Sequence, residues 1–257
     1  MSALNIAFYR SLVAALCLLP LAWTRRQPLD RASPLIALAY LGSVTLVVLA
    51  TKATTAANAI VLQYTAPAFV FLLGAALLDE RPERRDWLGL ALAMSGVACI
   101  ALGAGAADAL GVAFGLASGL AFGLLIVLLR RFRDRDPYWV LFCNNLVVAA
   151  LLFPWVRQEV WISSRDLALM LLMGSVQLGL AYLLFFMAMR HVSAREGSLI
   201  ALLEPLLNPI WVALAVGEIP GAYTLIGGIV VLGGLSLRYL RAPSRGPRAN
   251  ERLDPGS

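Results

Sequence analysis

The acid best placed for binding chemistry is Glu204, which lies in the apolar stretch 197–217. It is about 10 Å from the start of that stretch at the helical rise of ~1.5 Å per residue. Pro205 follows it directly and Pro209 lies one turn further on, and each proline removes an amide donor and frees a carbonyl. This pattern indicates a kinked, polar-lined segment whose carboxylate could bind a substrate ammonium group or titrate as a coupling-proton site. The alternative is a carboxylate that bonds only to distorted backbone or to a neighbouring helix.

Further polar side chains accompany this acid. Asn208 lies one turn after it and Trp211 nearly two, so the three share one helix face. An earlier apolar stretch has a similar segment, in which Gln63 and Tyr64 precede Pro67. We expect these groups to line an asymmetric substrate site, because the earlier segment has no acid at the matching place.

Two other apolar stretches carry a polar group at similar depth, Arg10 in one and Asn144 in the other. An anionic substrate group or an acidic partner would explain Arg10, whereas snorkelling of its head to the membrane surface is the alternative. Tyr40, Gln177 and Tyr182 could line a cavity, although aromatic residues inside membranes more often pack or anchor.

The elements that position these residues are helices in a lipid bilayer. The 257 residues are 60% hydrophobic and 14% charged, against about 25% charged in soluble domains. The apolar residues form blocks of about 20, the length that crosses a bilayer. We expect an all-α polytopic membrane protein with nine transmembrane helices, over 3–23, 34–51, 54–78, 87–105, 109–129, 137–156, 166–189, 197–217 and 221–240. The remaining segment, 241–257, is predicted to be a disordered basic tail.

Basic residues predict the orientation of these helices. Seventeen of them fall in the loops and tail on one side of the membrane, and only Lys52, Arg157 and Arg165 fall on the other. Because cytoplasmic loops are basic, this split predicts a cytoplasmic C-terminus. We expect the protein in an inner (plasma) membrane. The scattered arginines form no compact basic face, so nucleic acid is not an expected partner.

An internal repeat divides the chain. At an offset of 138, segment 52–102 matches 190–240, and an offset of 134 pairs Arg10 with Asn144. The first repeat, 1–105, has four predicted helices, and the second, 106–240, has five. An odd repeat unit inverts the topology between the halves, as in transporters that bind substrate at the repeat interface. The helix over 109–129 also carries four glycines at a spacing of four, which indicates close helix packing.

Signatures of enzymes, metal sites and ATP binding are missing from the sequence. The single histidine, His191, lies in a predicted cytoplasmic loop, which excludes HExxH and histidine-based triads, and no GxxxxGK[ST] motif occurs. Cys17, Cys99 and Cys143 stand alone in apolar blocks, so neither a disulfide framework nor a zinc site follows. We therefore expect no enzyme, no cofactor and no metal, and a gradient rather than ATP as the energy source.

The two blocks that begin at Thr55 and Ser198 resemble the signature regions of EamA-type members of the drug/metabolite transporter superfamily. Each combines a helix with a central proline, a terminal glutamate before a proline, and a glycine-rich following helix. The resemblance implies ten helices in two inverted halves of five, with both termini cytoplasmic. The first repeat has one helix fewer, so we expect a first helix to be missing upstream of Met1.

This resemblance implies a secondary transporter that exports a small metabolite, an amino acid or a drug-like compound by alternating access. The expected partners are a small-molecule substrate, the lipid bilayer and a proton as candidate coupling ion. A non-transporting receptor or assembly subunit, and a membrane enzyme without recognised motifs, are the alternatives.

Overall fold

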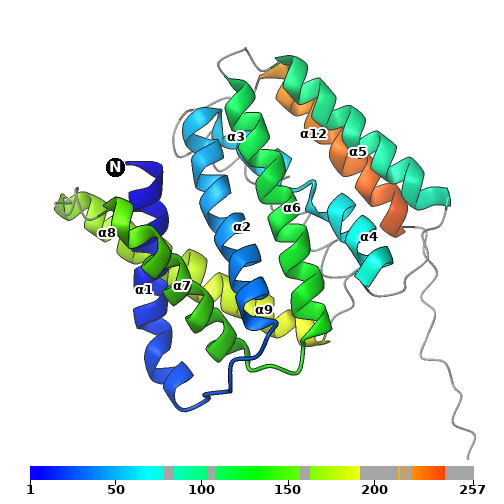
Figure 1. The fold of residues 1–257 in the computed structure, drawn as a ribbon. Coiled ribbons are helices and arrows are strands. Elements are labelled where there is room, and N and C mark those ends of the chain that lie inside the picture. The colour runs from blue at the N-terminus through cyan, green and yellow to red at the C-terminus, as the bar shows by residue number, and fades with distance from the viewer. Residues whose placement is uncertain are drawn as a thin grey trace, which may run out of the picture.

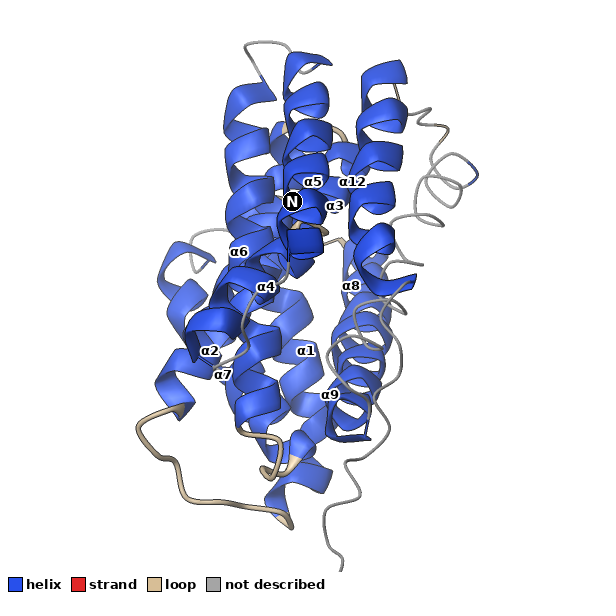
Figure 2. Cartoon of the chain, turned by 90° about the vertical axis from the view of Figure 1, so that its right-hand side faces the viewer, coloured by secondary structure: helices blue, strands red, loops and turns tan. Residues whose placement is uncertain are grey.

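The computed structural model describes residues 1–77, 84–103, 108–156, 163–191, 214, 217 and 221–240. This part of the chain is helical and contains no strand (Figure 2). The helices are α1 (Ala3–Trp23), α2 (Ser33–Ala53), α3 (Ala56–Gln63), α4 (Ala66–Leu77), α5 (Arg84–Gly103), α6 (Ala109–Arg131), α7 (Pro137–Val156), α8 (Ser164–Leu172), the π-helix η2 (Met173–Ala181), α9 (Tyr182–His191) and α12 (Ala222–Leu240).

Five helical segments are long and apolar enough to cross a membrane: α1, α2, α6, α7 and the continuous run of α8, η2 and α9. Shorter apolar helical runs cover 58–74, 87–96 and 222–234. Large aliphatic side chains cover the outside, among them Leu16, Leu38 and Leu172, each at least 60% exposed. Such a surface suits contact with lipid chains, and the all-helical polytopic membrane class is therefore confirmed. The count of nine spans stays a prediction.

Local sequence explains where several helices begin. Ser2, Thr55 and Ser163 precede α1, α3 and α8, and each hydroxyl accepts a hydrogen bond from the backbone N–H three residues on, at 3.1–3.3 Å. Pro34 and Pro137 stand in the first turns of α2 and α7, where a missing N–H costs nothing.

The predicted continuous helix over 54–78 is two helices, α3 and α4, separated by a turn at Tyr64 and Thr65. Pro67 is the second residue of α4, so it cannot donate to the carbonyl four residues earlier. The Thr65 hydroxyl donates to the Leu62 carbonyl at 2.7 Å and holds the turn. The proline thus lies just after a break rather than at a kink inside one helix.

The glycine face of α6 packs along the end of α2, then α3, this break and α4, and the predicted close packing is confirmed. Its members are Gly111, Gly115, Gly119 and Gly123. A Cβ built at Gly119 would lie 2.6 Å from Thr65 Oγ1 and 2.9 Å from the Leu62 carbonyl oxygen. The two backbones can approach this closely only because the α6 position has no side chain.

Helices that the predicted repeat relates lie side by side. α1 packs along α7, and α5 packs along α12 at one edge of the molecule (Figure 1). In the second pair, a Cβ at Gly96 would lie 2.5 Å from the Gly227 carbonyl oxygen. Between these pairs, α2 runs beside α6 in the middle of the bundle.

The loop between α1 and α2 meets the loop between α6 and α7 at one end of the bundle. Arg25 Nη1 lies 3.5 Å from Asp136 Oδ2, and Arg135 pairs with Asp30. Slight desolvation raises the pKa of Asp30, but hydrogen bonds from Ser33 and Arg135 outweigh it and hold the pKa below its usual value. The carboxylate is therefore ionised at neutral pH, and two basic loops share this end of the molecule.

Candidate functional site

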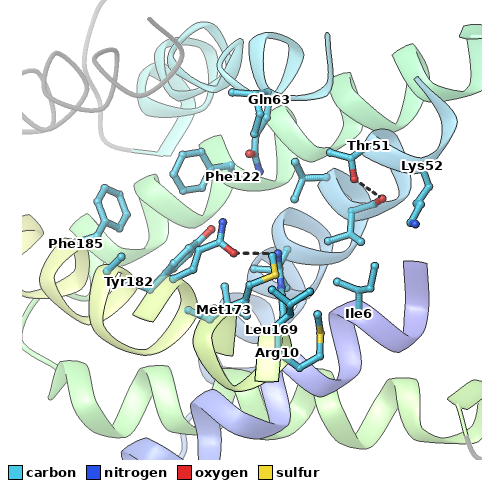
Figure 3. Close-up of a pocket in the computed structure, with 18 of the residues that line it drawn as sticks. Ile6, Arg10, Thr51, Lys52, Gln63, Phe122, Leu169, Met173, Tyr182 and Phe185 are labelled. Carbon is cyan, nitrogen blue, oxygen red and sulfur yellow. Dashed lines mark hydrogen bonds between the residues drawn. The ribbon is translucent and has the colours of Figure 1, made fainter. Parts of the chain in front are cut away.

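A cavity of about 750 Å³ lies inside the bundle, between α1, α2, α3, η2 and α9. Its rim at one end includes Met1, Lys52 and Asp166, which stand where α1 begins, α2 ends and α8 begins. This is the end opposite to the two basic loops. Figure 3 shows Arg10, Gln63, Phe122 and Tyr182 around the same space, each from a different helix.

In the part of the chain that the structure describes, Arg10 of α1 is the one charged side chain deep in the wall, and it is 6% exposed. Its Nη1 donates to Gln177 Oε1 at 3.2 Å, whereas its buried Nε has no hydrogen-bond partner. Among the described residues, no carboxylate lies within ion-pairing distance of the guanidinium. A buried cation paired only with a neutral amide is unfavourable, because its lost hydration is not replaced. The site is thus electrostatically suited to an anionic group.

The π-helix η2 brings Gln177 to Arg10. Gly174 of η2 sits against α1 so closely that a Cβ there would lie 2.6 Å from Val13 Cβ and 2.8 Å from the Arg10 carbonyl oxygen. This contact seats η2 directly on α1 beside the guanidinium. A π-helix turns less per residue than an α-helix and so re-aims the side chains that it carries, which is why such segments are frequent at functional sites.

Aromatic rings form much of the remaining wall. Phe122 of α6 lies 5.8 Å from Phe185 between ring centroids and 6.4 Å from Tyr64 in an edge-to-face arrangement. Tyr182 packs edge-on against Tyr40 at 5.5 Å. These faces and edges can hold an apolar or flat solute body by packing.

Polar groups are few in this wall. Gln63 is 8% exposed and its Nε2 donates to the Ser43 carbonyl at 3.3 Å. A mostly apolar cavity with a few convergent polar groups is the usual form of a small-molecule site.

Comparison with known proteins assigns the family. The model of the EamA-like transporter family matches residues 1–102 and 109–240. The chain belongs to this family.

Similar proteins include the uncharacterized transporter YdfC of Bacillus subtilis, 25% identical over 92% of this EamA-family chain and 82% of YdfC. An uncharacterized transporter of Archaeoglobus fulgidus is 29% identical over 92% of the chain and 86% of that protein. An uncharacterized protein of Pseudomonas aeruginosa is 30% identical over 70% of the chain, and the match spans only 63% of that protein's length. A solved crystal structure superposes with a TM-score of 0.69 over 93% of the chain and 88% of its own, at 18% identity, and this shows the fold alone. The family and these names point to transporters rather than enzymes.

Four of the residues that sequence reasoning proposed for the site line this one cavity of the EamA-family chain: Arg10, Gln63, Tyr64 and Tyr182. Gln177, expected to line a cavity, lies there too. Asn144 is 2% exposed and lines a different cavity, between α2 and α7, so the structure does not bring it to Arg10.

Five further candidates lie outside the described residues, namely Glu204, Pro205, Asn208, Pro209 and Trp211. The wall of the first cavity is built from α1, α2, α3, α6 and the continuous run of α8, η2 and α9.

Sequence reasoning missed Phe122 and Phe185, because phenylalanines in apolar helices are too common to mark a cavity. It also missed Lys52 and Asp166 as rim residues. The available signal was their charge: each is a rare ionisable residue at the end of an apolar stretch.

Proposed function

We propose that this EamA-family chain is a secondary transporter of a small organic solute that carries a carboxylate, held at Arg10. The observation that supports it is a buried guanidinium with an unpartnered Nε on the wall of a cavity large enough for a small molecule. A carboxylate accepts two parallel hydrogen bonds from a guanidinium, which is the strongest neutralisation available to Arg10. An amino acid, another metabolite or a drug-like acid all fit this description.

The burial of Arg10 favours binding over snorkelling. A snorkelling arginine extends its head to the membrane surface, whereas this one is 6% exposed and donates to Gln177 inside the bundle. The Gln177 amide oxygen would hold one N–H of the guanidinium while the site is empty. Replacing that neutral acceptor by a carboxylate exchanges a weaker hydrogen bond for a charge-assisted one.

The direction that we propose is export by alternating access, in an inner membrane with the C-terminus cytoplasmic. The cavity mouth at Lys52 and Asp166 lies opposite the basic loops and would then face outward. The four- and five-helix repeats, 1–105 and 106–240, would move against each other to close this mouth and open the other end.

Counterflow in proteoliposomes tests the proposal. Liposomes loaded with an unlabelled acid should accumulate the labelled acid, and the matching primary amides should exchange at least tenfold more slowly. This factor follows from hydrogen bonds to charged groups, worth about 1.5–3 kcal/mol, or roughly 10- to 100-fold. Equal exchange of acids and amides would contradict the carboxylate, and no saturable exchange of any solute would favour a receptor or assembly subunit.

Two variants test whether the preference for acids over amides depends on Arg10. Arg10→Gln should abolish the preference for acids over amides, since it keeps a donor but loses the charge. Arg165→Gln is the matched control, because Arg165 is exposed in the first turn of α8 and lies outside the cavity wall. An unchanged preference in Arg10→Gln would refute the role of Arg10.

Proton coupling is proposed for Glu204 on its position in the sequence. We expect Glu204→Gln to lose at least tenfold in counterflow at unchanged expression, and Glu204→Asp to lose less. Unchanged transport and pH dependence in Glu204→Gln would leave the residue no role in coupling.

A further inference from the structure

A second cavity, of about 500 Å³, lies between the first half of α2 and the length of α7. The loop residues Gln27 and Asp30, together with Arg135, form its rim. It is therefore at the end of the bundle where the basic loops meet, opposite to the mouth of the first cavity. The transport proposed for a solute held at Arg10 does not involve this second cavity.

Two buried N–H donors among the lining residues have no acceptor. Asn144 is 2% exposed and its Nδ2 has no hydrogen-bond partner, and neither has the buried Nε1 of Trp139. The adjacent Asn145 differs, since its Nδ2 donates to the Leu141 carbonyl at 3.0 Å and its Oδ1 accepts from Tyr40 at 3.1 Å. Buried donors are nearly always paired, so these two unpaired N–H groups indicate a ligand that brings acceptor oxygens.

The cavity opens sideways among apolar side chains. Leu29, Leu38 and Leu151 line it and are 67%, 62% and 50% exposed. Leu29 lies in the loop at the rim, whereas Leu38 and Leu151 lie within α2 and α7 and in a bilayer face lipid chains rather than water. A molecule that enters between them must therefore carry an apolar chain.

The charge at the rim, and the order of the polar side chains from the rim inward, indicate which class of ligand fits the cavity. Arg135 pairs with Asp30 and Arg25 with Asp136, so the positive charge near the rim that no described carboxylate neutralises comes from the exposed Arg26 and Arg31 of the same loop. Trp139 lies in the first turn of α7, and Asn144 lies deeper in the same helix. Positive charge at the surface, with amide and indole donors below it, matches a lipid that has an anionic headgroup followed by two ester carbonyls.

We propose that this second cavity binds an anionic glycerophospholipid from the leaflet next to the basic loops. Its acyl-ester carbonyls accept from Asn144 Nδ2 and Trp139 Nε1, one chain fills the apolar part, and its phosphate lies at the basic rim. An amide donor suits a neutral carbonyl, just as the guanidinium at the repeat-related position 10 suits a carboxylate.

Native mass spectrometry of the purified full-length chain tests the proposal, with added phosphatidylglycerol or phosphatidylcholine as probes. We expect phosphatidylglycerol to be retained at least fivefold better than phosphatidylcholine. Asn144→Leu, close in size but without a donor, should lose at least fivefold in phosphatidylglycerol retention. Leu146→Ala, on the lipid-exposed side of the same helix and outside the cavity, should retain it unchanged.

Trp139→Phe provides a second variant that removes an N–H and keeps an aromatic ring, should Asn144→Leu fail to fold. Unchanged retention in Trp139→Phe and in any folded Asn144→Leu would overturn the proposal, and so would equal retention of the two lipids by the unaltered chain. If a labelled solute loses affinity in Asn144→Leu while lipid retention is unchanged, the cavity binds solute and the lipid assignment is wrong. Loss of lipid retention with normal counterflow would leave the proposed transport at Arg10 intact.

Discussion

Replacement of Gly119 by alanine tests whether the break between α3 and α4 depends on close contact with a position of α6 that has no side chain. The new Cβ would lie 2.6 Å from Thr65 Oγ1, 2.9 Å from the Leu62 carbonyl oxygen and 3.0 Å from the Gln63 carbonyl oxygen. Two of these atoms belong to the backbone and cannot rotate away, so α6 must shift. Overpacking of this kind costs about 1–3 kcal/mol, and the better helix propensity of alanine offsets about 0.5–1 kcal/mol of it.

The matched control is Gly228→Ala in α12. Its Cβ would lie 3.7 Å from Val61 Cγ2, an ordinary contact, so the variant should keep the gain of about 0.5–1 kcal/mol in helix propensity. The free energies of unfolding of the two variants should therefore differ by about 1–3 kcal/mol, with Gly119→Ala the less stable. Titration with sodium dodecyl sulfate in mixed micelles, followed by circular dichroism, measures this difference. Equal stability of the two variants would refute the reasoning, because it would mean that α6 can move away without cost.

Three further predictions follow from contacts described above. Gly174→Ala should lower counterflow at least fivefold, because the new Cβ would push η2 off the backbone of α1; unchanged exchange would mean that this contact does not position the site. Tyr40→Phe should cost about 0.5–1.5 kcal/mol in the same micelle titration, since it removes the 3.1 Å hydrogen bond to Asn145 Oδ1, and a neutral result would show that water replaces it. In a background without the native cysteines, Lys52→Cys should react with an impermeant maleimide added outside, and Arg31→Cys only after permeabilisation; the reverse would invert the topology.

Much of the architecture follows from the sequence, because hydrocarbon tolerates few polar residues and backbone bonds must be made within each helix. The apolar blocks accordingly coincide with the described helices to within a few residues at α1, α6 and α7. The break at Tyr64 and Thr65 was not predictable in place, since Pro67 indicates only a local weakness. Contact with Gly119 of α6 accompanies the turn at that position, and such a contact between distant segments has no local signal.

The candidate site, too, could be predicted from the sequence only in part. Polar residues in apolar stretches led to Arg10 and Gln63, because an unneeded polar group there is costly. The same rule gives depth along a helix but not the direction in which a side chain faces, so it could not separate Asn144 from Arg10. No amino-acid composition distinguishes a π-helix from an α-helix, so the π-helix that carries Gln177 could not be predicted. Its position depends on the close contact between Gly174 and α1.

The side-by-side pairing of α1 with α7, and of α5 with α12, has a consequence for the history of the chain. Under the duplication that the sequence predicts, each pair descends from one helix packed against an identical copy of itself. A substitution in that ancestor appeared on both sides of the contact at once and had to be compatible with itself. Once the ancestral gene had been duplicated and the two copies joined in one chain, this constraint ended, because a substitution could then occur in one copy without the other. Positions 10 and 144 illustrate the freedom gained: one holds a guanidinium against the first cavity, and the other an amide against the second.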